Sequence, residues 1–96
     1  MAKKSILTPN LTVCVFCGRR KQAIHHIYYG TALRKVSDKH GFIAPVCNAC
    51  HNIDNDSIHL DPARKKDLFL KRLCQKRYEE NHTREDFMKL IGRNYL

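Results

Sequence analysis

Two Cys-x-x-Cys pairs constrain the fold of this chain more than any other feature of its sequence. The pairs are Cys14 with Cys17 and Cys47 with Cys50. Such a pair places two thiolates on a tight turn, where both sulfur atoms reach one metal ion at about 2.3 Å. Two pairs supply four ligands and leave no open coordination position, which is typical of a structural zinc site. The intervening residues 18–46 are more than the roughly 15–20 of a simple zinc ribbon, so we expect further structure there.

The charge of the chain indicates a phosphate-rich partner. Its 96 residues contain 18 lysines and arginines against 9 acidic residues, a formal net charge of +9. Such an excess favours nucleic acid or an anionic membrane surface. A membrane is the weaker alternative, because no apolar run approaches the roughly 20 residues that span a bilayer and residues 1–10 lack a secretory signal. We therefore expect a cytoplasmic protein whose reduced cysteines bind metal.

The order of β-prone and helix-prone segments predicts a small α+β fold. Strands are expected over residues 11–16, 23–29 and 42–46, with a connecting loop or short helical turn over 32–40. Helices are expected over residues 48–55, 62–80 and 84–92. The last two have clear start signals, Asp61-Pro62 and a capping box from Thr83 to Asp86, and Gly92 is a stop signal.

The domain organisation predicted from these segments is simple. Residues 1–10 are expected to be a flexible basic N-terminus. Residues 11–96 are expected to form one domain, with a metal-stapled core over 11–60 followed by the two C-terminal helices. The fifth cysteine, Cys74, lies among apolar residues and is interpreted as a small core residue.

The histidines around the cysteine pairs suggest a second metal site. His51 follows the second pair directly, so the first metal cluster would fix its position. Asn55 lies one helical step of four further on and His59 another four, and either could provide a second ligand. His25 could complete the site from the facing strand. Because adjacent strand residues point to opposite faces, one of His25 and His26 would bind metal and the other would be free to act as a base, provided that a twist or bulge brings both near one substrate.

The order of cysteine pair, His-His, cysteine pair and His over residues 14–59 resembles the HNH endonucleases. It is most similar to small phage-encoded HNH proteins with four-cysteine zinc sites, in which a tail like residues 92–96 also recurs. The resemblance implies a ββα-metal, treble-clef-like HNH core, in which a β-hairpin is crossed by a helix with one metal ion between them. It also implies a DNA endonuclease working in the cytoplasm, that of the bacterial host if the chain is phage-encoded.

The resemblance also assigns roles to the histidines. His26 would be the general base that activates water, while His25 and His51 would hold a divalent ion such as Mg²⁺, Mn²⁺, Ni²⁺ or Zn²⁺, with His59 as third ligand. The central Asn of the family normally stands about nine residues before the helical His, a place that Phe42 occupies here. We expect Gly41 to let the backbone turn without that side chain.

The basic residues predict contacts with DNA and little sequence preference, with no small-molecule cofactor. The residues expected to contact DNA are Arg34, Lys35, Lys65, Arg72 and Lys76. A solvated face is the usual meaning of such charges, but the excess of positive charge favours phosphate contact. The alternative function is a non-catalytic zinc-finger module that binds nucleic acid. A plain zinc ribbon has no use for His25, His26 and His51 together, which favours the enzyme.

Overall fold

The structure is a computed structural model that describes residues 4–96. Its elements follow the order β1 (Ala23–His26), α1 (Thr31–His40), β2 (Ile43–Val46), η1 (Ala49–Ile53), α2 (Lys65–Glu79) and α3 (Arg84–Ile91). The radius of gyration, 12.9 Å, is close to the roughly 12.5 Å expected for a folded domain of this length. The predicted α+β class is confirmed. None of the helices in the described part is long and apolar enough to cross a membrane.

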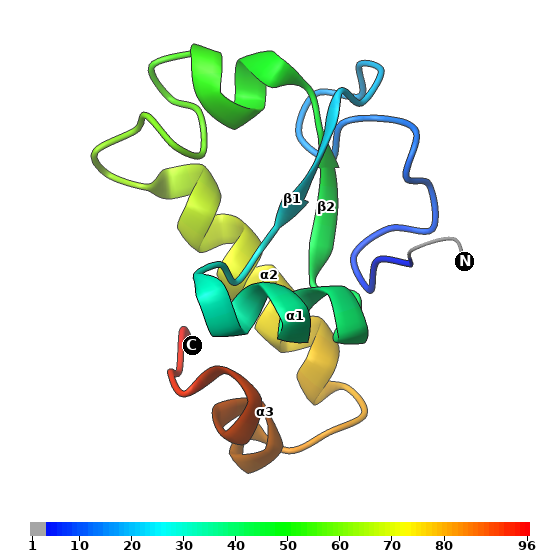
Figure 1. Cartoon of the computed structure of the whole chain (residues 1–96), viewed down its shortest axis with the longest axis vertical. Coiled ribbons are helices and arrows are strands. Elements are labelled where there is room, and N and C mark those ends of the chain that lie inside the picture. The colour runs from blue at the N-terminus through cyan, green and yellow to red at the C-terminus, as the bar shows by residue number, and fades with distance from the viewer. Residues whose placement is uncertain (1–3) are drawn as a thin grey trace.

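An antiparallel hairpin of β1 and β2 forms the centre of the fold, with His25 opposite Ala44 and His26 opposite Ile43. All four residues of β2 are buried. In Figure 1, α1 and α3 gather at one end of the hairpin, and the green turn of η1 follows β2 at the other end. The strand predicted over residues 42–46 is therefore confirmed from Ile43 onward.

The strand predicted over residues 11–16 is not formed. Only a single bridge pairs Val13 with Arg20. The chain reverses at the first cysteine pair, where Cys14 N donates to the Arg19 carbonyl at 2.6 Å and Gly18 has a φ of 76°. This turn is fastened to the hairpin because Val15 N donates to the carbonyl of Pro45, 2.9 Å away. The tight knuckle thus replaces an extended strand.

A full helix, α1, replaces the loop or short turn predicted over residues 32–40. Leu33, Val36 and Ser37 lie on one side of it, and this side packs on the core. Ser37 Oγ donates to the Tyr28 carbonyl at 2.6 Å, and Gly41 ends the helix in the left-handed conformation. Charged residues outnumber the apolar positions along this helix, so the sequence pattern does not indicate it.

The later helices keep their predicted order but shift at their boundaries. The one expected over residues 48–55 is a single π-helical turn, η1. α2 begins at Lys65, not at residue 62, because Arg64 has a φ of 54° and interrupts the helical path. Asp61 still caps the turn that leads into α2, since its carboxylate accepts a hydrogen bond from Ala63 N at 2.9 Å. α3 has the predicted capping box of Thr83 and its C-cap at Gly92.

An aromatic cluster holds the C-terminal helices against the hairpin. Phe42 is fully buried, and its ring centroid lies 5.4 Å from that of Tyr28 and 6.4 Å from that of Phe87. Phe42 is therefore a central residue of the core. Cys74 is also fully buried, which confirms its interpretation as a core residue.

Part of the segment predicted as a flexible tail over residues 1–10 contacts the domain, and residues 1–3 of it lie outside the described residues. Ser5 Oγ donates to the Ile43 carbonyl, and Ile6 N donates to the Gly41 carbonyl at 3.0 Å. Ile6 and Leu7 are partly buried against the core. Apolar side chains at these two positions therefore attach the segment to the domain.

Candidate metal centres

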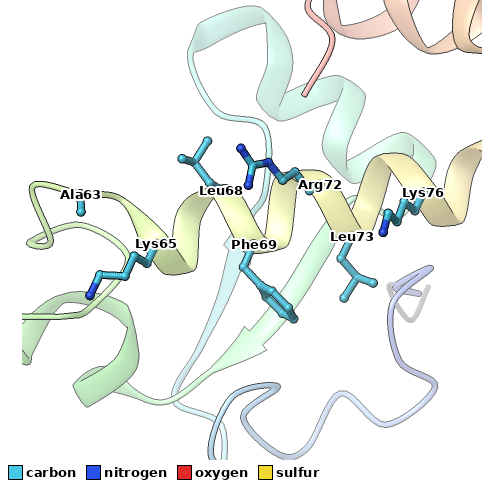
Figure 2. A pocket seen from close by; sticks show the side chains of 7 residues that line it. All are labelled: Ala63, Lys65, Leu68, Phe69, Arg72, Leu73 and Lys76. Carbon is cyan, nitrogen blue, oxygen red and sulfur yellow. The ribbon is translucent and has the colours of Figure 1, made fainter. Parts of the chain in front are cut away.

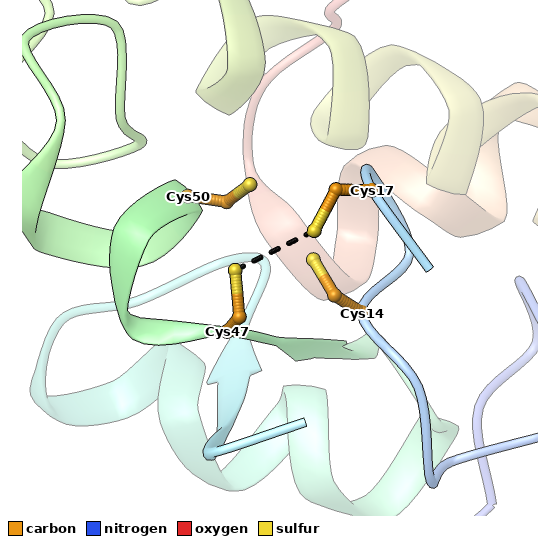
Figure 3. A group of neighbouring side chains, drawn as sticks. All are labelled: Cys14, Cys17, Cys47 and Cys50. Carbon is orange, nitrogen blue, oxygen red and sulfur yellow. Dashed lines mark hydrogen bonds between the residues drawn. The ribbon is translucent and has the colours of Figure 1, made fainter. Parts of the chain in front are cut away.

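The four paired cysteines converge on one point, as Figure 3 shows. All four Sγ atoms lie within 4.8 Å of one another, and those of Cys17 and Cys47 are 3.6 Å apart. This separation is far beyond the roughly 2.05 Å of a disulfide bond. Four sulfurs at about 2.3 Å from a tetrahedral zinc ion are separated by roughly 3.8 Å. The cluster therefore fits a four-cysteine metal site.

The electrostatics of the four thiols favour a cation between them. Burial raises the pKa of Cys14, but hydrogen bonds from the backbone N–H groups of Cys47, Cys17 and Phe16 outweigh it and bring the pKa to about 7. The pKa of Cys50 is raised, first by burial, then by its hydrogen bond with Cys47 and by the charge on Cys14. One thiolate thus forms readily and opposes the ionisation of another, a conflict that a bound cation removes.

Three histidines from three segments form a second group. His25 lies on β1, His51 on η1 and His59 in the loop that follows, and their ligand nitrogens lie within 4.8 Å of one another. The Nε2 atoms of His51 and His59 are 3.0 Å apart. Imidazoles bound at about 2.05 Å to a tetrahedral ion have nitrogens roughly 3.3 Å apart, so the arrangement fits a shared cation.

His25 is the buried member of this group, with only 4% of its surface exposed. Its Nε2 atom is buried and has no hydrogen-bond partner within residues 4–96. Burial, followed by the charges of His51 and His59, lowers the pKa of His25 to about 3. The ring is therefore neutral at pH 7 and has a nitrogen without a partner, which is the condition for a metal ligand.

The backbone holds His51 and His59 next to the cysteine cluster. His51 N donates to the Cys47 carbonyl at 3.0 Å, directly after the second cysteine turn. Ile58 N then donates to the Cys50 carbonyl at 2.9 Å, and His59 N to the His51 carbonyl at 3.1 Å. His59 thus joins the group because the chain doubles back on η1, not because a helix continues to it. Asn55, the predicted alternative, is exposed.

The His26 ring contacts α1. Its Nε2 atom lies 2.9 Å from Oδ1 of Asp38. If this nitrogen donates to the carboxylate, Nδ1 becomes the proton-accepting nitrogen. Asp38 also lines a hollow of about 600 Å³ together with Gly30, Thr31, Arg34 and Lys35. Two of the predicted DNA-contacting residues, Arg34 and Lys35, therefore lie beside the partner of His26.

The other predicted DNA-contacting residues lie on a different surface. Lys65, Arg72 and Lys76 line a pocket of about 450 Å³ on α2, as Figure 2 shows. The five basic residues predicted to contact DNA are therefore divided between the α1 hollow and the α2 pocket.

A polar network that was not predicted from the sequence lies at the edge of the histidine group. The Tyr29 ring centroid lies 6.0 Å from that of His25, and its hydroxyl lies 3.2 Å from both Asp67 Oδ1 and Arg64 Nη1. Lys71 Nζ lies 2.9 Å from Asp67 Oδ2 and 4.4 Å from the Tyr29 ring centroid. The i, i+4 spacing of Asp67 and Lys71 was a usable signal, whereas nothing in the sequence connected Tyr29 to them.

Lys71 remains cationic in this network. Burial by itself lowers its pKa, but the hydrogen bond and the charge of Asp67 outweigh burial and raise it. The edge of the histidine group therefore includes a buried ion pair and the exposed guanidinium of Arg64.

Comparison of the chain with protein-family models, with curated proteins and with solved structures finds no match.

Proposed function

We propose that this chain is a metal-dependent DNA endonuclease of the HNH type, with a ββα-metal, treble-clef-like core. The observation that carries the proposal is the histidine group, in which the unpartnered, buried Nε2 atom of His25 belongs to a cluster of three possible ligands. A binding module that used only the cysteine cluster would not need a second group of this kind.

The two clusters differ in the way that separates structural from catalytic metal sites. The four-cysteine group can fill a tetrahedral coordination sphere, which suits a structural zinc ion. His25, His51 and His59 provide only three ligands and would leave coordination positions open for substrate. A divalent ion such as Mg²⁺, Mn²⁺, Ni²⁺ or Zn²⁺ held there supplies stabilisation of the negative charge on the phosphate and on the leaving 3′ oxygen.

His26 would perform the proton transfer in this proposal. Its Nε2 contact with Asp38 fixes the ring and makes Nδ1 the nitrogen that accepts a proton from water. The attack of that water on the phosphorus atom forms the new P–O bond as the 3′ oxygen leaves. Asp38 is a positioning residue here, because it acts on the reaction through His26.

The charge distribution supports DNA as the substrate. The net charge of +9 favours the phosphate backbone, and contacts of that kind are largely independent of sequence and weaken with salt. Arg34 and Lys35 lie beside Asp38 and would place phosphates on the same side of the hairpin as His26. We further propose that the protein acts in the cytoplasm, where reduced thiols bind zinc.

A plasmid-nicking assay with added Mg²⁺, Mn²⁺, Ni²⁺ or Zn²⁺ tests the proposal. We expect the wild-type chain to nick DNA and His26→Ala to be slower by roughly 10²–10⁴-fold, the usual contribution of a general base. Zinc content and DNA affinity should not change. His82→Ala is a matched control, because His82 is an exposed histidine outside both clusters.

Two outcomes would contradict the proposal in different ways. If His26→Ala nicks DNA as fast as the wild type, the assignment of the base is wrong. If the wild-type chain binds DNA and nicks it with none of the four ions, the zinc-finger binding module is the better account of the cysteine cluster and the charge.

A further inference from the structure

The outer side of α2 carries a surface that the proposed chemistry does not use. Every residue lining the 450 Å³ pocket there is either apolar or cationic; they are Ala63, Lys65, Leu68, Phe69, Arg72, Leu73 and Lys76. We call this surface the Phe69 face. Figure 2 shows the Phe69 and Leu73 side chains projecting from one side of the helix, and Lys65, Arg72 and Lys76 spaced along it. A surface of this composition suits a ligand that is both flat and anionic.

Phe69 is the unusual member of this face, because 54% of its surface is exposed. The ring packs on one side near another aromatic ring, that of Phe16, whose centroid lies 6.2 Å away. Phe16 stands between the two cysteines of the first knuckle, and Lys66 Nζ lies 5.6 Å from its ring centroid. The metal cluster therefore supports an aromatic ring that is held at one edge and largely open to solvent.

The cations of the Phe69 face differ from the other cations of α2 in having no carboxylate partner in the described part of the chain. Lys66, Lys71 and Arg77 each have a carboxylate within 4.0 Å, in Asp56, Asp67 and Glu80. Within residues 4–96, by contrast, no carboxylate forms an ion pair with Lys65 or Lys76. Arg72 Nε donates to the Tyr95 carbonyl at 3.3 Å, which fixes its guanidinium. Three cations that no carboxylate of the described residues neutralises thus lie along the same face as the exposed ring.

We infer that the Phe69 face binds single-stranded DNA, with an unpaired base stacked on Phe69 and the backbone phosphates held by Lys65, Arg72 and Lys76. Exposed aromatic rings flanked by cations bind single strands in this way, because every base has a face for stacking. These cations span about 16 Å of helix, from the rise of 1.5 Å per residue, which is long enough to follow several nucleotides. In a duplex the bases already stack on one another, so Phe69 would gain little there.

The inference rests on the proposed function only for the choice of DNA, and it names the substrate class as DNA with an unpaired segment. The test is fluorescence anisotropy of a labelled oligo-dT strand, using the zinc-containing full chain without added divalent ions. We expect Phe69→Ala to weaken binding about 5- to 150-fold, the loss of one base–aromatic stack. Phe69→Leu, which keeps an apolar side chain without an aromatic ring, should show a similar loss.

Two controls separate stacking from other effects. Met88→Ala removes another exposed apolar side chain, on α3, and should bind the strand as the wild type does. An abasic strand of equal length has the phosphates without the bases, so wild type and Phe69→Ala should bind it equally. Zinc content and melting temperature of each variant establish that the knuckle beside Phe16 is intact.

Several results would overturn the inference. Equal affinity of wild type and Phe69→Ala for oligo-dT would remove Phe69 from the site, and an equal loss on the abasic strand would exclude stacking. If poly-glutamate, at the same concentration as the strand, displaced the strand from the protein, an acidic protein would be the better partner for this face. Sedimentation showing a dimer that Phe69→Ala dissociates would assign the face to a second copy. Strand binding that depends on Phe69 without any cleavage would contradict only the proposed endonuclease.

Discussion

The Nε2 atoms of His51 and His59 lie 3.0 Å apart, although eight residues of α-helix would separate the two positions by about 12 Å. The chain closes this gap because η1 ends at Ile53 and a turn follows, in which Ser57 N donates to the Asp54 carbonyl at 2.9 Å. The returning segment then bonds to the carbonyls of Cys50 and His51. The histidine group is consequently built on the second cysteine turn.

This arrangement predicts that His59, and not Asn55, contributes to the affinity for the catalytic ion. His59→Ala should weaken binding of added Co²⁺ or Mn²⁺ by at least the 10–100-fold that loss of an outer-shell partner costs, because it removes a ligand atom. Asn55→Ala is the matched control and should bind as the wild type does. Isothermal titration calorimetry on zinc-containing protein measures both, and equal losses in the two variants would reject the assignment.

A second prediction concerns the cysteine cluster. Purified protein should contain one tightly held zinc ion, and Cys47→Ser should lose it and unfold, because structural zinc supplies on the order of 10 kcal/mol in zinc-finger peptides. Cys74→Ala also changes a buried cysteine but lies outside the cluster, so it should keep its zinc and lose only about 1–2 kcal/mol of stability. Metal analysis after dialysis measures the zinc content of the two variants, and circular dichroism measures whether each is folded. Less than about half a zinc ion per wild-type chain would refute the structural role.

A third prediction follows from the contact between His26 and Asp38. Asp38→Asn should slow cleavage about 10–100-fold, by analogy with the loss of a carboxylate that orients a metal-ligating histidine, with little effect on substrate affinity or zinc content. Asp56→Asn is the control, because Asp56 is another exposed carboxylate, paired with Lys66 3.1 Å away. Single-turnover kinetics of nicking on a supercoiled plasmid measure the step. Unchanged kinetics in Asp38→Asn would mean that the carboxylate does not position the base.

A fourth prediction compares two glycines with similar backbone angles, Gly41 with a φ of 76° and Gly92 with a φ of 82°. Alanine at either position should cost about 1–2 kcal/mol, because the left-handed region is unfavourable for a residue with a Cβ atom. At Gly41 the new Cβ would also lie 2.6 Å from the backbone carbonyl oxygen of Lys4, whereas nothing lies within 4 Å at Gly92. We therefore expect Gly41→Ala to be the more destabilised in urea unfolding. Equal losses of unfolding free energy in the two variants would show that the N-terminal segment moves away from the new Cβ atom without an energetic penalty.

Local chemistry explains the parts of the structure that the sequence predicted correctly. Two Cys-x-x-Cys pairs have few uses other than a shared metal ion, and the capping box at Thr83 defines a helix start through bonds within one turn. The strand from Ile43 was predictable for a similar reason, since a run of buried apolar residues leads directly into the second pair. Interactions of this kind depend on residues only a few positions apart.

The predictions that were wrong depended on distant partners. The helix over residues 31–40 was not predicted, because its few apolar positions form a buried side only through packing on the core and the Ser37 contact with Tyr28. The contacts of the N-terminal segment also depend on a distant partner, since Ile6 N donates to the carbonyl of Gly41. Phe42 packs against Tyr28 and Phe87, which residue spacing does not reveal.

The sequence by itself determined which residues can share a metal ion, because ligand chemistry and short spacing are properties of the chain. It named the four cysteines, His25 and His51, and it left His59 and Asn55 as alternatives for the third ligand; the structure groups His59 with the other two histidines. Only the tertiary structure decided that His59 reaches the group by a reversal of the chain, that His26 faces Asp38, and that an exposed Phe69 stands beside the first knuckle. Those outcomes arise because packing and backbone hydrogen bonds between separate segments, and not local preference, set where each side chain lies.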